Sequence, residues 1–225
     1  MIHFRNRKEA GQLLAMELAH YAGRTDLLIL ALPRGGVPVA YEIAQVLHAP
    51  LDVLLVRKLG VPGHEETAMG AIATGGIRLL NQQMISALGI SPESVAEVNR
   101  LEEEEMERRE RTYREKLPPL DPEGKTVILV DDGIATGSTM QAAITSLHRR
   151  HAGRIVVAAP VAPVSVVTLL RQMADEVVCV MTPEDFRGVG WWYEDFSQTS
   201  DEQVRNLLGV TVSSPSSLNS LPSRL

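Results

Sequence analysis

The chain has 225 residues, 44% of them hydrophobic, and a formal net charge of −6 at pH 7. This length suits one domain with an insertion, and the acidic balance argues against a general nucleic-acid-binding surface. The single cysteine, Cys179, excludes an intramolecular disulfide and a cysteine-based zinc site. No apolar stretch approaches the roughly 18–20 residues of a membrane span, and the N-terminus lacks a signal-peptide core, so we expect a cytoplasmic protein.

The first part of the chain alternates between helical and strand patterns. Residues 7–21 have apolar side chains at helical spacing and end before Gly23, a suitable helix stop. Residues 27–32 and 51–56 are apolar runs that predict buried strands, and residues 37–47 between them have helical periodicity. This order of strand, helix and strand predicts a parallel sheet with right-handed crossovers.

The next segment has the composition of a loop followed by a hairpin. Residues 59–68 are polar and are interrupted by Pro62 and Gly63, which predicts a loop at the carboxyl end of a strand. Residues 71–74 and 77–80 flank two successive glycines, a signal for a short hairpin.

A long charged helix is predicted over residues 94–117, capped by Ser91 and Pro92 and ended by two prolines at 118–119. We expect it to face solvent or another subunit, because a charge run of this kind usually forms a solvated face. Four glutamate–arginine pairs at i, i+4 should support it: Glu104–Arg108, Glu105–Arg109, Glu107–Arg111 and Glu110–Arg114.

The last part of the chain predicts two more strands, at residues 154–159 and 176–181, with a helix at 165–173 between them. Residues 181–196 hold both tryptophans and two of the three phenylalanines. A short helix is expected over residues 201–208. The serine- and proline-rich tail, residues 211–225, is expected to be disordered.

The most informative stretch is residues 126–139, TVILVDDGIATGST. Its apolar start predicts a strand buried on both faces, and residues 140–148 after it predict a helix. Between them lie Asp131, Asp132 and a loop of glycines and hydroxyl residues, which can present N–H and O–H groups to a phosphate at a helix start. An ordinary strand-to-helix turn with Asp and Thr caps is the alternative. A P-loop and a dinucleotide fingerprint are excluded by the glycine spacing and the absent lysine.

These residues, in this order, closely resemble the motif of type I phosphoribosyltransferases that binds phosphoribosyl pyrophosphate (PRPP). The resemblance extends over about residues 27–181. It implies an α/β fold with a parallel twisted sheet flanked by helices, a small hood and, in this chain, a helical insertion. The expected division is a phosphoribosyltransferase domain over residues 1–210, with its core at about 24–182. The insertion is expected at about 82–118, and the hood in the N-terminal segment and about 181–210.

A protein that uses PRPP needs a phosphate cradle, acceptors for the ribose hydroxyls and positive charge near the pyrophosphate. Residues of this chain can be assigned to each of these roles. Asp131 and Asp132 can accept from ribose hydroxyls, and their negative charge suits a transition state with oxocarbenium character. We expect Asp131, Asp132, Arg34 and Lys58 to be catalytic. The predicted 5-phosphate loop comprises Gly133, Ala135, Thr136, Gly137, Ser138 and Thr139. The predicted pyrophosphate site comprises Pro33, Arg34, Gly35, Gly36, Arg57 and Lys58.

Three further expectations come from the resemblance. The peptide bond Pro33–Arg34 should be cis, residues 59–68 should form a mobile loop that closes over PRPP, and the hood should select the acceptor base. Trp191 or Tyr193 could stack on that base, although aromatic residues this dense are at least as often packing residues.

The resemblance implies an Mg²⁺-dependent enzyme of nucleotide metabolism that transfers the 5-phosphoribosyl group from PRPP to a nitrogenous base. The metal is expected to arrive with the pyrophosphate, where Asp131 and Asp132 could contact it, because two carboxylates alone are a thin ligand set. A homodimer is expected from the family. The alternatives are a non-catalytic regulator that binds PRPP or a nucleotide, and a ribose-phosphate hydrolase. Nothing in the sequence names the acceptor.

Overall fold

A parallel sheet forms the core of the protein. The computed structural model describes residues 3–114 and 120–210, and in this part of the chain the sheet has the order β2-β1-β6-β7-β8. All neighbouring strands in it are parallel, so the predicted α/β class is confirmed. The strands are β1 (Leu27–Ala31), β2 (Leu51–Val53), β6 (Thr126–Val130), β7 (Arg154–Val161) and β8 (Glu176–Met181).

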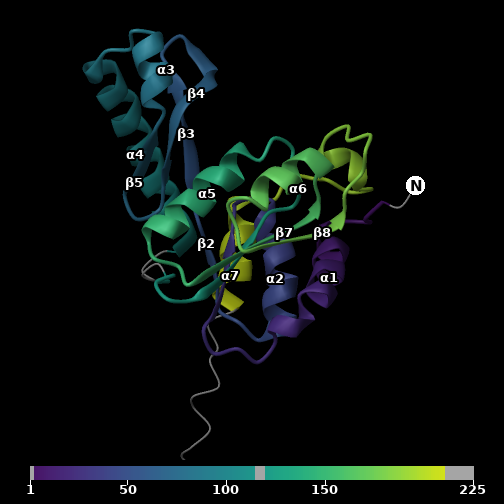
Figure 1. Ribbon diagram of the computed structural model, residues 1–225. Coiled ribbons are helices and arrows are strands. Elements are labelled where there is room, and N and C mark those ends of the chain that lie inside the picture. Colours follow the sequence, from purple (N-terminus) through teal and green to yellow (C-terminus); the bar gives the residue numbers. More distant parts are fainter. Residues whose placement is uncertain (1–2, 115–119, 211–225) are drawn as a thin grey trace, which may run out of the picture.

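Helices cover both faces of this sheet. One layer holds α1 (Arg7–Glu17), α2 (Gly36–Leu47) and α7 (Asp201–Val210), and the other holds α5 (Ser138–Arg149) and α6 (Val164–Leu170) (Figure 1). Every residue of β1 is buried. Leu28 and Leu30 pack with α5 and α6, whereas Ile29 packs with α1, α2 and α7 on the other face. Because successive side chains of a strand point to opposite faces, an unbroken apolar run needs a helix layer on each side.

The strand order creates a crevice at the carboxyl ends of β1 and β6. From β1 the chain first adds β2 on one side, and later adds β6 on the other side. Ligands of open α/β sheets bind where the strand order reverses in this way, outside the carboxyl ends of the strands. The turn at residues 33–36 follows β1, and Asp131 and Asp132 follow β6. Both predicted site segments therefore lie at this crevice.

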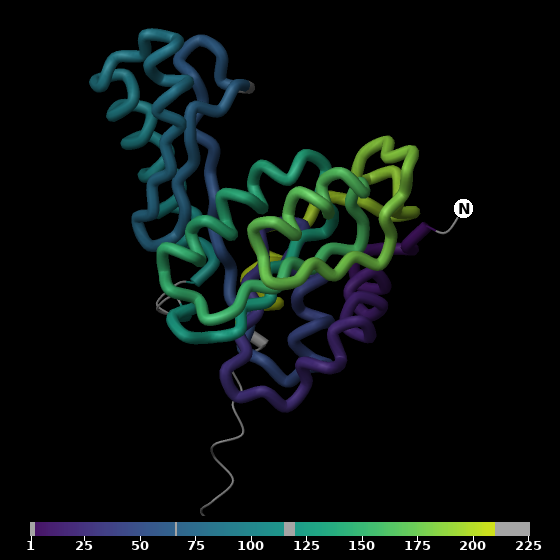
Figure 2. Tube along the Cα trace, in the orientation of Figure 1, coloured from purple at the N-terminus to yellow at the C-terminus, as the bar shows by residue number. Residues whose placement is uncertain are grey.

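Residues 56–114 leave the core as an arm, which Figures 1 and 2 show extending from one side of the molecule. Its antiparallel sheet has the order β3-β4-β5, and the long helix α4 packs against β3 and β4. The insertion predicted from about residue 82 thus begins earlier, with three strands. The elements of the arm are β3 (Val56–Val61), β4 (His64–Ala73), β5 (Ile77–Leu80), α3 (Gln82–Ala87) and α4 (Pro92–Arg114).

The predicted strand at residues 51–56 is wrong in its second half. β2 ends at Val53, and the N–H of Leu54 still donates to the last carbonyl of β1. The chain then changes partner and pairs with β4 in the arm. Arg57 and Lys58 consequently lie inside β3 of the arm and not at the end of a core strand. The apolar run continues across this change, so its composition does not mark the boundary.

The expectation of a loop at residues 59–68 is also wrong. These residues belong to β3 and β4, joined by a turn at Pro62 and Gly63. Polar side chains do not prevent pairing here, because the strands of the arm hydrogen-bond to each other through their backbones. The hairpin predicted around Gly75 and Gly76 is confirmed: it joins β4 to β5, and both glycines have positive φ angles.

Ion pairs line the surface of α4. Three of the four predicted pairs are present: Glu105–Arg109 at 2.8 Å, Glu107–Arg111 at 3.5 Å and Glu110–Arg114 at 3.3 Å. The fourth is replaced by other pairs of the same helix, because Glu104 bonds Arg100 and Arg108 bonds Glu105.

Beside the carboxyl edge of the sheet, the N-terminal segment packs against residues 181–196. Phe4 donates its N–H to the carbonyl of Trp192 (2.9 Å) and accepts from the N–H of Glu194 (2.8 Å). The 3-10 turn η2 (Val189–Trp192) lies in this region, and another, η1 (Ala19–Tyr21), follows α1. The predicted helix at 7–21 is therefore α1 followed by η1.

Several expectations concern residues 115–119 and 211–225, which lie outside the described part of the chain. They are the end of the charged helix at 117, the two prolines at 118–119 and the disordered tail. Within residues 3–114 and 120–210, no helix combines the length and apolar character needed to cross a membrane.

Candidate functional site

Two loops meet at the crevice between β1 and β6. The N–H of Leu32 donates to the carbonyl of Val130 (2.8 Å), which ties the end of β1 to the end of β6. The peptide bond between Pro33 and Arg34 is cis, as expected. The N–H of Gly36 then donates to the carbonyl of Leu32 (3.1 Å) and starts α2. The turn at residues 33–36, called the pyrophosphate turn below, thus lies directly beside Asp131 and Asp132, the acidic pair. Residues 133–139 after them are called the phosphate loop.

Glycine is required at position 35 because the acidic pair comes so close. A β-carbon on Gly35 would lie 1.9 Å from Oδ2 of Asp132, and one on Gly36 would lie 2.7 Å from the carbonyl oxygen of Val130. Real β-carbons essentially never make contacts under 3.0 Å. The turn predicted to bind pyrophosphate therefore packs directly against a carboxylate predicted to bind the sugar.

The two carboxylates of the acidic pair have different surroundings. Asp131 accepts a hydrogen bond from the backbone N–H of Asp132 (2.8 Å). Burial, and then the neighbouring charge of Asp132, raise the pKa of Asp131 well above its ordinary value. Asp132 instead forms an ion pair with Arg7, with 2.7 Å between Nε and Oδ2. Its backbone carbonyl accepts from the hydroxyl of Tyr193 (2.5 Å).

The phosphate loop after the acidic pair is anchored at its start and open at its end. Gly133 and Ile134 are buried, and the N–H of Ile134 donates to the carbonyl of Val161 (2.9 Å). Gly137 caps α5 with a φ of +76°, a conformation that favours glycine. Ala135, Thr136, Ser138 and Thr139 are exposed at the start of α5. A helix start with accessible amides and hydroxyls is a suitable site for a phosphate.

Arg34 lies at the tip of the pyrophosphate turn, about one third exposed, 3.8 Å from the Asp201 carboxylate at the start of α7. The hydroxyl of Tyr113, on α4, donates to the same carboxylate (2.8 Å). Burial, and then the hydrogen bond to Asp201, raise the pKa of Tyr113 to about 12. Arg34 is therefore held by a carboxylate that also contacts the arm.

The other two predicted cations, Arg57 and Lys58, reach the site from the arm. A cavity of about 560 Å³ lies between β3 and α4, and Thr139 of the phosphate loop also lines it. Lys58 is exposed in this cavity. Arg57 forms an ion pair with Glu102 of α4, and its Nη1 lies 3.9 Å from Glu105. The arm thus brings positive charge to the phosphate loop, with Arg57 already neutralised by α4.

Of the two predicted hood residues, only one has an accessible ring. Tyr193 is 6% exposed and packs between Phe4 and Phe196, with centroid distances of 5.3 and 5.1 Å. Burial raises the pKa of Tyr193, so its hydroxyl remains a donor to Asp132. Trp191 is 48% exposed and lies under the guanidinium of Arg187. Tyr193 is thus a packing residue in this structure, whereas Trp191 presents a ring to solvent.

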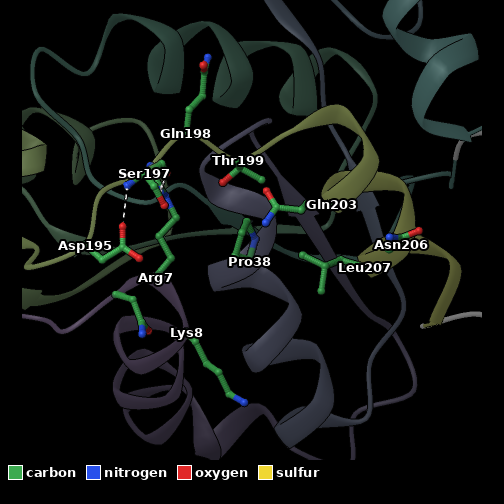
Figure 3. A pocket seen from close by; sticks show the side chains of 11 residues that line it. Arg7, Lys8, Pro38, Asp195, Ser197, Gln198, Thr199, Gln203, Asn206 and Leu207 are labelled. Atoms are coloured by element: carbon green, nitrogen blue, oxygen red, sulfur yellow. Dashed lines mark hydrogen bonds between the residues drawn. The ribbon is translucent and has the colours of Figure 1, made fainter.

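Sequence reasoning missed Arg7, which lies in α1 and contacts the acidic pair. It is an ordinary cation in a helical pattern, and no local signal distinguishes it from the other arginines. Figure 3 shows Arg7 beside a second cavity of about 400 Å³, which is lined by the start of α1, residues 195–199 and α7. Arg7 thus lines this cavity and also contacts Asp132.

A dedicated metal site is not present among the described residues, which contain no group of three or more His, Cys, Asp or Glu side chains suited to a metal. Mg²⁺ commonly takes one or two carboxylates together with substrate phosphates and water. The acidic pair fits that pattern, since Asp131 forms no ion pair with a described residue.

Comparison with known proteins agrees with this geometry. The family model for the phosphoribosyl transferase domain matches residues 4–191. Two Mycobacterium tuberculosis proteins, from strains H37Rv and CDC 1551, are 43% identical over 201 residues, which is 89% of this chain and 45% of theirs. Both are named as phosphoribosyl transferases of unproven activity. The chain thus spans a little under half the length of these relatives.

Among solved structures, the protein TT1426 from Thermus thermophilus is 41% identical, with a TM-score of 0.79. The match covers 92% of this chain and 98% of TT1426, so the arm and the core are both part of the shared fold. Together with the family match and the paired loops at the β1–β6 crevice, this shows that the chain belongs to the type I phosphoribosyltransferase family.

Proposed function

We propose that the protein transfers the 5-phosphoribosyl group of PRPP to a nitrogenous base, with release of pyrophosphate and with Mg²⁺ as cofactor. One observation carries the proposal: the backbone of Gly35 lies against the carboxylate of Asp132. This contact joins the turn suited to pyrophosphate to the strand end suited to ribose. A single ligand that bears both groups can therefore contact both loops.

In this proposal each part of PRPP has its own protein partners. The 5-phosphate binds the amides and hydroxyls of residues 135–139 at the start of α5. Asp131 and Asp132 face the ribose hydroxyls. The pyrophosphate binds the amide of Gly35, and Arg34 and Lys58 supply positive charge. Arg57 joins them when it leaves its carboxylate partner on α4.

The reaction breaks the bond between the anomeric carbon and the pyrophosphate oxygen, and forms a bond from that carbon to a nitrogen of the base. Positive charge develops on the sugar as the bond breaks, and the carboxylate of Asp131 stabilises it. The leaving oxygen becomes negative, and Arg34 and Lys58 stabilise that charge. Bound Mg²⁺ would neutralise part of the pyrophosphate charge. The acceptor loses a proton, and the carboxylate of Asp131, whose pKa is raised, is suited to take it.

The arm is suited to limit the access of water to this reaction. The hairpin formed by β3 and β4 lines the cavity next to Thr139, together with one face of α4. A hairpin over the phosphate loop would protect the reactive sugar from hydrolysis. A homodimer and a role in nucleotide metabolism complete the proposal, and both rest on the family resemblance. The proposed cytoplasmic location rests on the sequence pattern alone.

The test is pyrophosphate release from PRPP and Mg²⁺ in the presence of a panel of purine and pyrimidine bases. We expect one class of base to stimulate release, and the double variant Asp131→Asn/Asp132→Asn to lose it. Asp185→Asn, which removes the charge of one exposed carboxylate, is a control for each of the two substitutions. If PRPP binds tightly and no base stimulates release, the protein is a PRPP-binding regulator. If ribose 5-phosphate forms without a base, it is a hydrolase.

A further inference from the structure

Arg7 and Asp132 form a partly buried ion pair between two segments that are 125 residues apart in the chain. The Nε of Arg7 lies 2.7 Å from Oδ2 of Asp132, and the two side chains are 11% and 13% exposed. Most ion pairs elsewhere in the described chain, such as Arg100 with Glu104, lie at the surface. Partial burial leaves little water to screen the Arg7–Asp132 attraction, so the loss of either partner would leave a poorly solvated charge.

The guanidinium of Arg7 is held from three sides. Its Nη1 donates to the carbonyl of Ser197 (2.7 Å), a contact drawn in Figure 3. Its Cζ lies 4.1 Å from the ring centroid of Phe196, which suits a cation–π contact. The helix that carries Arg7 begins at a fixed point, because the side chain of Asn6 accepts from the N–H of Glu9 (3.0 Å). Arg7 therefore has one preferred position.

The carboxylate of Asp132 also lies against the turn after β1. A β-carbon on Gly35 would lie 1.9 Å from its Oδ2, the same oxygen that Arg7 binds. The backbone carbonyl of Asp132 is occupied by Tyr193. Asp132 thus makes protein contacts through both its side chain and its backbone. Asp131, by contrast, forms no ion pair with any described residue.

The two carboxylates would repel each other if nothing offset their charge. Adjacent acidic side chains at a strand end raise the energy of the loop when both are ionised. One guanidinium at 2.7 Å offsets one of these charges and supplies a directed hydrogen bond. A lysine would supply the charge without the fork that also reaches Ser197.

We propose that Arg7 is a positioning residue for the sugar site: it holds Asp132 against the pyrophosphate turn, and Asp131 is the carboxylate that binds the ribose. This inference rests on the proposed function and divides the roles of the two acidic residues. Asp132 acts through the structure of the loop, and Asp131 acts on the substrate. The first helix of the chain thereby becomes part of the PRPP site.

The test is a double-mutant cycle on PRPP affinity, measured by calorimetry with PRPP and Mg²⁺. Arg7→Gln should weaken binding by about 10- to 100-fold, and Arg7→Lys should restore part of the loss. In the Asp132→Asn background, Arg7→Gln should change the affinity less than about twofold, because its partner is already neutral. Asp131→Asn should weaken binding in every background.

A matched control separates positioning from general stability. Arg114 forms a buried ion pair with Asp52, away from the phosphate loop. Arg114→Gln should lower the unfolding temperature and leave PRPP affinity unchanged. Hydrogen–deuterium exchange of residues 131–139 should increase in Arg7→Gln and not in Arg114→Gln, with or without ligand.

The inference is overturned if Arg7→Gln binds PRPP as the wild type does, or if it weakens binding equally in the Asp132→Asn background. Unchanged exchange of residues 131–139 in Arg7→Gln would also overturn it. Failure of the wild-type protein to bind PRPP would contradict the proposed function, and the exchange measurement would still decide whether Arg7 holds the loop.

Discussion

The ion pair between Arg57 and Glu102 predicts that a change in the arm will increase affinity for pyrophosphate. Arg57 lines the cavity beside the phosphate loop, but its guanidinium is bound by Glu102 and lies 3.9 Å from Glu105. A pyrophosphate that uses Arg57 must first displace Glu102. Glu102→Gln removes this competing charge and keeps the size of the side chain.

The magnitude follows from the exposure of the pair. The side chains of Arg57 and Glu102 are 24% and 26% exposed, between the fully exposed pairs that contribute about 0–1 kcal/mol and the buried pairs whose rupture costs about 3–5 kcal/mol. We therefore expect a gain of about 1–2 kcal/mol, which corresponds to about 5- to 30-fold in affinity. Glu105 remains in Glu102→Gln, so the larger figure is an upper bound.

Calorimetric titration of pyrophosphate with Mg²⁺, at one ionic strength, measures this gain directly. Glu104→Gln is the matched control, because it makes the same charge change on α4 while Glu104 pairs with Arg100 at the surface. It should alter affinity less than twofold. Equal affinities of Glu102→Gln and the wild type would show that Glu102 does not compete with pyrophosphate for Arg57. An equal gain in Glu104→Gln would show that only the overall charge of α4 matters.

Four further outcomes can be checked. Gly35→Ala should weaken PRPP binding at least tenfold by calorimetry, because the added methyl group overlaps the Asp132 carboxylate at 1.9 Å; wild-type affinity would contradict this. Arg114→Gln should lower the free energy of unfolding in urea by about 3–5 kcal/mol, because Asp52 would remain as an unpaired buried charge. Burial raises the pKa of Cys179 to about 11, so its thiol should react slowly with a disulfide reagent at pH 8 until the protein unfolds. Because the native state holds this proton more tightly, the free energy of unfolding should fall as the pH rises from about 9 to about 11.

The core strands and the loops at their ends could be predicted because each is specified by its own residues. β1 and β6 are apolar at nearly every position, so they must be buried on both faces wherever they lie. The two aspartates and the glycine- and hydroxyl-rich loop of Asp131 to Thr139 are consecutive in the chain, so this motif can be recognised from the sequence. Two glycines in succession mark the β4–β5 turn for the same local reason.

The arm could not be predicted in full, because its first strand is defined by its partner. No glycine or proline separates β2 from β3. The boundary lies where the N–H of Leu54 still bonds the end of β1 and the N–H of Leu55 bonds the hydroxyl of Thr74 in the arm. The partner of Leu55 is 19 residues away, and pairing at that distance depends on the whole arm.

The chain by its residues alone specifies a parallel α/β core, the position of the acidic pair and a loop suited to phosphate, because local pattern and periodicity carry those features. Only the tertiary structure decides what surrounds them. It places Gly35 against Asp132, and it forms the ion pairs of Asp132 with Arg7 and of Arg57 with Glu102 in the arm. These contacts join distant segments, and charge and burial at such contacts exist only after the chain has folded.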